Sequence, residues 1–232
     1  MKKKQLAAVL VLGMVCTLIT TVPVCAQETK DTGAAHTIAC LGDSITYGFV
    51  KDPTTGEESG TSYPMDLNIL LGDDYNVVNF GKPGAYATHD DGTLSIWNQE
   101  VYQQALELDA DTFIVMLGTN DSHEDTFDEQ AFSADYEAII DSLQEAHPDA
   151  AFYLMTSPCS YNNDLADEGL LHGQIYETIN SVGEKKGIPV IDLHTYTHDH
   201  PEWFRDQLHP NDVGYAVLSA YIYDQIKGEL EE

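Results

Sequence analysis

Four short polar motifs in this chain contain the residue types that acyl transfer requires. In chain order they are Gly-Asp-Ser-Ile-Thr with Ser44, Asn-Phe-Gly-Lys-Pro-Gly ending at Gly84, Gly-Thr-Asn-Asp with Asn120, and Asp-Gln-Leu-His with Asp206 and His209. Acyl transfer needs a hydroxyl activated by an adjacent base, an oriented imidazole, and N–H donors at the place where an oxygen becomes negative. The motifs therefore predict a serine that attacks a carbonyl carbon.

Each residue receives a role in this prediction. We expect Ser44 to be the nucleophile, His209 to be the general base, and Asp206, about one helical turn away, to orient the imidazole. The backbone N–H groups of Ser44 and Gly84 and the side-chain amide of Asn120 would form an oxyanion hole. Because only neutral imidazole acts as a base, activity should rise as His209 loses its proton near pH ~6 to 7.

Apolar runs before these motifs predict the elements that position them. Buried strands are expected at 37–41, 76–80, 112–117, 151–156 and 189–193, and helices at about 63–71, 94–108, 130–147, 170–186 and 211–227. The third helix carries an apolar stripe at three- and four-residue steps: Phe132, Tyr136, Ile139, Ile140 and Leu143. Strands that alternate with helices predict one three-layer α/β domain with a parallel sheet, whose carboxyl edge would gather the motifs.

The four motifs resemble the sequence blocks of the SGNH hydrolase superfamily, also called the GDSL esterases. The blocks stand in the family's order, and the resemblance spans roughly residues 38–227. It implies a flavodoxin-like five-stranded sheet ordered 2-1-3-4-5, hydrolysis of esters or thioesters through an acyl-enzyme, no metal and no cofactor. The chain contains no Gly-x-Ser-x-Gly after a strand, which argues against an α/β-hydrolase nucleophile elbow.

Two stretches are similar to secreted bacterial carbohydrate O-acetylesterases, namely Gly-Thr-Asn-Asp-Ser and residues 199–204. We therefore expect a small-molecule or carbohydrate ester as substrate, with acetyl as the acyl group. Arg205 and the pair Gln207-Leu208, which replaces a small glycine-containing pair, depart from the family pattern and put the sugar specificity in doubt. A lysophospholipase, thioesterase or lipase of the same superfamily is the alternative enzyme, and a non-catalytic carbohydrate-binding module is the alternative outside enzymes.

Several of these residues also have purely structural interpretations. Ser44 could cap a helix, Asn120 could end a strand, and Gly84 could supply a positive φ in a turn. We expect Asp43 and Asp121 to be structural. The aromatic residues Tyr161, Trp203 and Phe204 would either line the substrate site or pack in the interior.

Histidines raise the question of a metal site. His194, His198 and His200 have ligand-like spacing, and His123 stands beside Glu124 and Asp125. The proposed chemistry needs no ion, and loops rich in His and Asp are usually solvated, so we predict no metal.

The amino-terminal residues have the layout of a secretory signal peptide. Lys2, Lys3 and Lys4 precede an apolar run, and Val24-Cys25-Ala26 precedes the expected cleavage site. Valine before Cys16 and Cys25 disfavours a lipid anchor. We therefore expect a signal peptide at 1–26, a polar lead-in at 27–36, an SGNH hydrolase domain at 37–229, and a destination outside the cytoplasm, either extracellular or in the cell envelope.

Composition excludes several partners. The chain carries 10 Lys+Arg and 39 Asp+Glu, a net charge of −29, and loss of the three leader lysines would make it −32. Such a surface repels nucleic acid and anionic lipid headgroups. No membrane span is expected, and the oligomeric state is not predicted. Cys40 and Cys159 are expected to be small buried hydrophobic residues without a disulfide.

Overall fold

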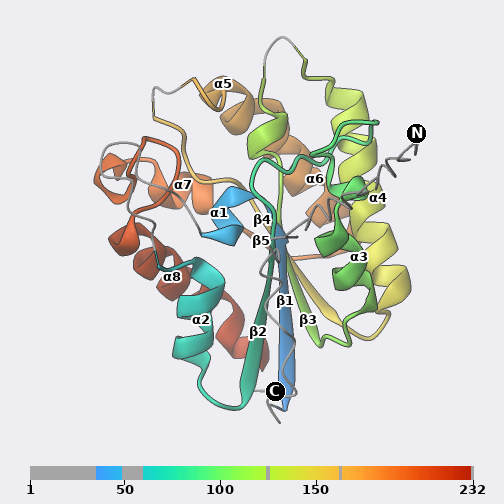
Figure 1. Cartoon of the computed structure of the whole chain (residues 1–232), viewed down its shortest axis with the longest axis vertical. Helices are drawn as coiled ribbons and strands as arrows, with labels where there is room; N and C mark the ends of the chain where they lie inside the picture. The colour runs from blue at the N-terminus through green and yellow to red at the C-terminus, as the bar shows by residue number, and fades with distance from the viewer. Residues whose placement is uncertain (1–34, 49–59, 124–125, 162–163, 231–232) are drawn as a thin grey trace, which may run out of the picture.

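The computed structural model describes residues 35–48, 60–123, 126–161 and 164–230. The predicted signal peptide at 1–26 and most of the lead-in at 27–36 lie outside these residues. A five-stranded sheet forms the centre of a single α/β domain (Figure 1). Its strands are β1 (His36–Gly42), β2 (Tyr75–Gly81), β3 (Thr112–Met116), β4 (Ala151–Met155) and β5 (Val190–Ile191). All neighbouring strands are parallel and the order is β2-β1-β3-β4-β5, which confirms the prediction.

Both faces of the sheet are buried, as the near-continuous apolar strands predict. In β1, Ala39 and Leu41 belong to one apolar cluster, whereas Ile38 and Cys40 belong to the other. Successive side chains of a strand point to opposite faces, so every residue of such a strand can be apolar. Cys40 is a free thiol within this core, as predicted.

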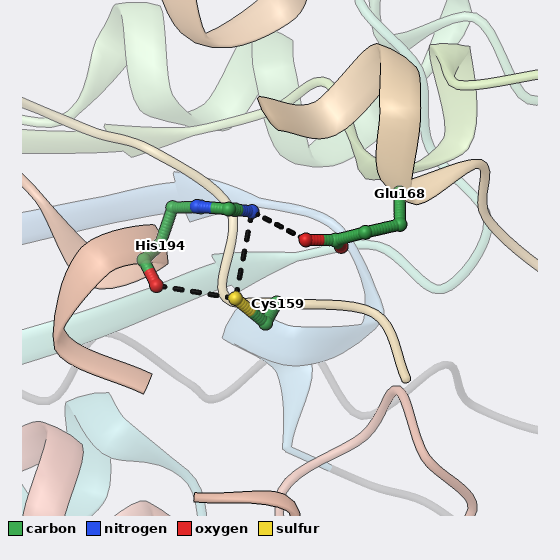
Figure 2. A group of neighbouring side chains, drawn as sticks. All are labelled: Cys159, Glu168 and His194. Atoms are coloured by element: carbon green, nitrogen blue, oxygen red, sulfur yellow. Dashed lines mark hydrogen bonds and ion pairs between the residues drawn. The ribbon is translucent and has the colours of Figure 1, made fainter. Parts of the chain in front are cut away.

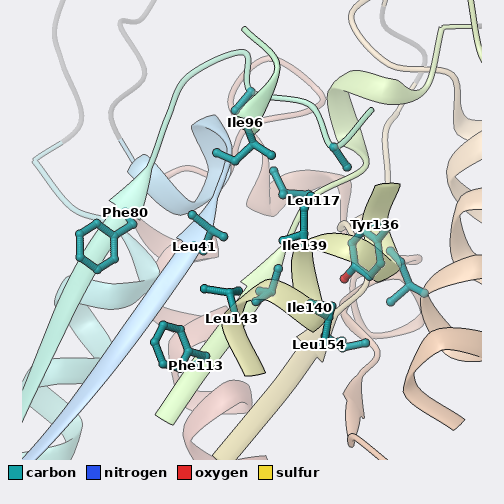
Figure 3. Packing of buried hydrophobic residues seen from close by; sticks show 14 of the residues in the cluster. Leu41, Phe80, Ile96, Phe113, Leu117, Tyr136, Ile139, Ile140, Leu143 and Leu154 are labelled. Carbon is teal, nitrogen blue, oxygen red and sulfur yellow. The ribbon is translucent and has the colours of Figure 1, made fainter. Parts of the chain in front are cut away.

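Helices cover the sheet in two layers (Figure 1). The layers consist of α3 (Glu100–Glu107), α4 (Glu129–Ala146) and α6 (Tyr176–Lys186) on one face, and α2 (Tyr63–Leu71) and α8 (Asp212–Leu230) on the other. The predicted stripe of α4 is buried, and Figure 3 shows Ile139, Ile140 and Leu143 packed near Leu41 and Phe113 of the sheet. No helix in the described part of the chain is both long and apolar enough to cross a membrane.

Two predicted helices are interrupted. The helix expected at 94–108 is a 3-10 turn, η1 (Ile96–Asn98), followed by α3, because Gln99 is extended and its side chain donates to the carbonyls of Thr93 and Ser95. The helix expected at 170–186 begins as α5 (Glu168–Leu170) and η3 (Leu171–Ile175), where Gly173 leaves helical geometry. Within the range expected to be one helix, the regular α-helix is α6, which begins at Tyr176.

Short elements that the sequence analysis did not predict follow the ends of three strands. They are α1 (Ser44–Tyr47) after β1, η2 (Thr119–Asp121) after β3, and α7 (Leu193–Thr197) after β5, with η4 (Pro201–Trp203) further along. The strand expected at 189–193 is short because Asp192 caps α7, its carboxylate accepting from the Thr195 N–H. α1, η2 and α7 therefore lie beyond the carboxyl ends of the strands that precede them.

Candidate active site

Ser44 lies at the first position of α1, directly beyond the end of β1. The residue that caps this helix is Asp43, whose Oδ1 accepts the N–H of Ile45 at 2.8 Å. The capping interpretation of Ser44 is therefore wrong, and its hydroxyl is not used by the helix. Gly42 permits the sharp turn, because a Cβ there would lie 2.1 Å from Thr46 Oγ1.

The hydroxyl of Ser44 faces the imidazole of His209. Ser44 Oγ lies 2.9 Å from Nε2, and Nδ1 lies 2.8 Å from Oδ2 of Asp206. All three side chains are only partly exposed. With the proton on Nδ1, the ring donates to Asp206 and accepts from Ser44, which is the tautomer that a general base requires.

A closed loop holds Asp206 and His209 together. Phe204 and Pro210 form an antiparallel bridge at its base, and the Arg205 N–H donates to the His209 carbonyl at 2.9 Å. The segment between them is not helical, since Gln207 has a φ of +70°. This residue belongs to the pair that departs from the family pattern, and the left-handed conformation explains why glycine suits the position.

The carboxylate of Asp206 is held on both oxygens. While Oδ2 accepts from the ring, Oδ1 accepts the N–H groups of Leu208 at 3.1 Å and His209 at 2.7 Å. Burial acts to raise the pKa of Asp206, but the hydrogen bonds from His209 and the loop outweigh it and lower the pKa to about 2. Asp206 is therefore ionised at neutral and mildly acidic pH.

The two other predicted oxyanion-hole residues are linked to each other. Lys82 to Ala85 form a turn in which the Ala85 N–H donates to the Lys82 carbonyl at 2.9 Å, with Gly84 at φ +79°. Proline before glycine in this arrangement is typical of a type II turn. The Ala85 carbonyl accepts from the Asn120 side-chain amide at 2.9 Å, which leaves that amide its second N–H. Among the described residues, no group accepts from the N–H of Ser44 or Gly84.

Two acidic residues support this edge. Asp121 accepts the N–H groups of Ala87 and Thr88 and the Thr88 hydroxyl, and so ties the loop after β2 to η2. Asp43 is fully buried, and burial raises its pKa to about 6 even though the Ile45 N–H donates to it. Both fit the structural role expected of them.

The predicted histidine triplet does not converge. His194 is buried, whereas His198 and His200 are more exposed and pair with Asp199 and Glu202. His123 is exposed, and Glu124 and Asp125 lie outside the described residues.

His194 instead contacts Cys159 and Glu168, two residues that the sequence analysis did not group with it (Figure 2). Cys159 is buried and carries a free thiol, as predicted, but its surroundings are polar rather than hydrophobic. His194 is 35 residues from Cys159 and 26 from Glu168. The three residues follow no spacing motif, so no sequence signal could have found them.

The aromatic residues near the loop that holds Asp206 and His209 pack mainly against their neighbours. Phe204 is 7% exposed and contacts Tyr161, with ring centroids 5.2 Å apart. Trp203 stacks on His200 at 3.7 Å and also contacts Tyr196. The packing interpretation therefore holds for Phe204, and the rings of Trp203 and His200 form a partly exposed stack.

Comparisons with known proteins agree with this geometry. The model of the GDSL-like lipase/acylhydrolase family matches residues 40–217. An acetylxylan esterase from Xylanibacter ruminicola is 28% identical over 213 residues, which cover 82% of this chain and 43% of that protein. The chain thus spans less than half the length of this curated relative.

Solved structures share the fold. A lipase/acylhydrolase from Enterococcus faecalis is 25% identical with a TM-score of 0.65, over 84% of this chain and 96% of that one. A carbohydrate acetylesterase from Sinorhizobium meliloti is 14% identical with a TM-score of 0.64, over 83% of this chain and 99% of that one. A family two carbohydrate esterase from Clostridium thermocellum, solved with cellohexaose, is 18% identical with a TM-score of 0.63, over 85% of this chain and 65% of that one. The last two show likeness of fold alone.

Proposed function

The chain belongs to the GDSL-like lipase/acylhydrolase family, and we propose that it hydrolyses carboxylic esters by nucleophilic attack from Ser44. The observation that carries this proposal is the unbroken hydrogen-bond chain from Ser44 Oγ through His209 to Asp206, with distances of 2.9 and 2.8 Å. Such a chain supplies a nucleophile, a base and the group that orients the base.

The reaction has two halves. Ser44 Oγ bonds to the ester carbonyl carbon while its proton moves to His209 Nε2, and that proton then passes to the departing alcohol. Water next attacks the carbonyl carbon of the acyl-enzyme and gives a proton to His209. The bond from that carbon to Ser44 Oγ then breaks, the acid leaves, and His209 returns the proton to Ser44 Oγ. The N–H groups of Ser44 and Gly84 and the amide of Asn120 stabilise the negative oxygen in both halves.

Asp206 does not take a proton in this scheme. Its pKa of about 2 keeps it ionised beside the imidazolium that forms when His209 is protonated. Its charge stabilises that imidazolium, and its two loop hydrogen bonds fix the direction in which Nε2 points. Protonation of this carboxylate would therefore not limit activity at mildly acidic pH.

The proposed substrate is an acetyl ester on a carbohydrate. Support comes from the acetylxylan esterase relative and from the carbohydrate esterases that share the fold. The net charge of −29 also disfavours anionic lipid substrates, which the surface would repel, whereas acetylated neutral sugars carry no charge.

Release of p-nitrophenol from the acetate, butyrate and decanoate esters tests the mechanism and the acyl length together. We expect turnover to be greatest on acetate and to fall at least about 10⁴-fold in Ser44→Ala. Ser181→Ala, the same change at an exposed position of α6, is the matched control and should keep full activity.

The outcomes separate the alternatives. Preference for decanoate would favour a lipase, lysophospholipase or thioesterase, and equal rates in Ser44→Ala and the parent chain would refute the serine mechanism. If acetate is preferred, acetate release from acetylated xylo-oligosaccharides is the next measurement, and its absence would reject the sugar substrate.

We also propose that residues 1–26 direct export and are then removed. The basis is the lysine-rich start, the apolar run and the Val24-Cys25-Ala26 sequence. Mass spectrometry of the protein recovered from an expressing bacterial culture should find Gln27 at the amino terminus. Retention of Met1 in a cytoplasmic product would contradict the proposal.

A further inference from the structure

Three side chains with different ligand atoms converge outside the hydrogen-bond chain of Ser44, His209 and Asp206. Cys159 follows β4, Glu168 begins α5, and His194 lies in α7. His194 Nε2 lies 2.8 Å from Glu168 Oε1 and 3.5 Å from Cys159 Sγ (Figure 2). We propose that Cys159, Glu168 and His194 bind a zinc ion.

The geometry favours a metal over a second nucleophilic triad. In a cysteine triad, the thiol and the carboxylate use different nitrogens of the imidazole. Here both face the same atom, His194 Nε2, so the carboxylate cannot orient the ring for the thiol. Three ligand atoms that all lie within 4.8 Å of one another instead surround one point.

The spacing is close to that of a tetrahedral zinc site. Zn–S of about 2.3 Å and Zn–N of about 2.0–2.1 Å place the two ligand atoms about 3.5 Å apart at a tetrahedral angle. The observed separation of Sγ and Nε2 is 3.5 Å. The oxygen needs a separation of about 3.3 Å from the nitrogen, so the Glu168 carboxylate would withdraw by about half an ångström from its present hydrogen bond.

The ligands are held in place by their own surroundings. The Cys159 N–H donates to Thr197 Oγ1 at 2.9 Å, which joins the cysteine to the helix that carries His194. The Ser160 N–H donates to Glu168 Oε2 at 2.7 Å, so that Oε1 is the oxygen turned toward His194. Such outer hydrogen bonds lower the cost of ordering the ligands around an ion.

One side of the cluster opens to solvent. A cavity of about 530 Å³ includes Cys159, Glu168 and His198 in its lining. His194 is 1% exposed, so the open side is the one toward Glu168. A water molecule from the cavity would complete the four ligands. Sulfur and nitrogen ligands beside one carboxylate suit zinc, whereas magnesium and calcium prefer oxygen alone.

Binding would release a proton. Burial raises the pKa of Cys159 to about 12, so the thiol is protonated at neutral pH until an ion coordinates it. The sulfur loses its proton to solvent as the Zn–S bond forms. Coordination through His194 Nε2 requires the lone pair of that nitrogen, so the ring proton must stand on Nδ1 when the ion is bound.

Calorimetric titration of the metal-free full chain with zinc chloride tests the site. The variants are Cys159→Ala, His194→Gln and Glu168→Gln, and the matched controls are Cys40→Ala and His200→Gln. Cys40 is the other buried free thiol in the described chain, and the His200 side chain is 41% exposed. Titration in two buffers with different ionisation heats measures the proton release.

We expect the parent chain and both controls to bind about one equivalent of zinc with release of about one proton. Cys159→Ala and His194→Gln should lose this binding, and Glu168→Gln should weaken it at least about tenfold. Cobalt should give a thiolate-to-metal absorption band in the parent chain and in Cys40→Ala but not in Cys159→Ala. Circular dichroism of each variant checks that it is folded.

Equal uptake by all folded variants would assign zinc to the surface carboxylates and overturn the proposal. No uptake by the parent chain would also overturn it, because the three residues would then be a hydrogen-bonded cluster only. Ser44→Ala should bind zinc like the parent chain, so this result is independent of the esterase assay.

Discussion

Replacing Asp206 by Asn exposes how the catalytic loop sets the tautomer of His209. One carboxylate oxygen accepts the N–H groups of Leu208 and His209, and the other accepts from the ring. In the variant, the single remaining oxygen should keep the two loop N–H groups, because an NH₂ group there would face two donors. The NH₂ group would then donate to Nδ1, place the ring proton on Nε2, and prevent acceptance of the Ser44 proton.

The magnitude follows from this geometry. A histidine fixed in the wrong tautomer lowers kcat by about 10⁴-fold in a serine triad, which corresponds to about 5.5 kcal/mol of transition-state stabilisation. Stability should change little, since the two loop hydrogen bonds remain and the third becomes a neutral one. The expected loss is about 1 kcal/mol, or about 2–4 °C in Tm for a domain of this size.

The assay is kcat and KM on p-nitrophenyl acetate, with Tm measured on the same samples. Asp128→Asn is the matched control, because one oxygen of Asp128 also accepts two backbone N–H groups, those of Gln130 and Ala131, both at 3.0 Å. It should leave kcat unchanged. A folded Asp206→Asn variant that keeps more than about a tenth of the parent kcat would refute the tautomer argument.

Three further predictions concern neighbouring residues. Asn120→Ala should lower kcat on p-nitrophenyl acetate about 10²- to 10³-fold with little change in KM, because one oxyanion donor is lost. An unchanged kcat would show that Asn120 is not a donor of the oxyanion hole. Gly84→Ala should lower Tm and kcat together, since alanine at φ +79° costs about 1–2 kcal/mol and its Cβ would lie 3.0 Å from Leu94 Cδ1; an unchanged melting curve would contradict this strain. The folded pKa of Asp43, about 6, is above its ordinary value of 3.8, so the parent chain loses stability as pH rises from about 4 to about 6. Melting curves at pH 5 and pH 8 should therefore show that the Tm of Asp43→Asn is higher relative to the parent Tm at pH 8 than at pH 5. An equal difference in Tm at the two pH values would contradict a buried charge on Asp43.

The sequence predicted regular elements well where their pattern was long. The stripe from Phe132 to Leu143 gave the buried face of α4, and the apolar runs gave the positions of all five strands. The order of the strands in the sheet came from the family resemblance. The predicted ends of elements were wrong where a side chain makes hydrogen bonds to backbone groups that a regular helix or strand would use. Gln99 interrupts the helix expected at 94–108, and Asp192 ends β5 early, because each makes hydrogen bonds that no periodicity encodes.

The sequence could place the motifs around Ser44 and His209 at one sheet edge, because the carboxyl ends of parallel strands lie together. It could not decide whether Asp43 or Ser44 caps α1, since both types suit a cap and only the backbone path distinguishes them. Nor could it predict that the Gly84 turn and Asn120 are joined through the Ala85 carbonyl.

Local residue types and their periodicity thus determined the strands, the layers and the set of chemical groups in the candidate active site. Tertiary structure alone decided which distant side chains meet. Cys159 and His194 are 35 residues apart and Glu168 is 26 from His194, yet their polar atoms converge because the segment after β4 and the starts of α5 and α7 lie together. Periodicity reports the face of one element, whereas contacts between elements depend on how loops and helix ends pack in three dimensions.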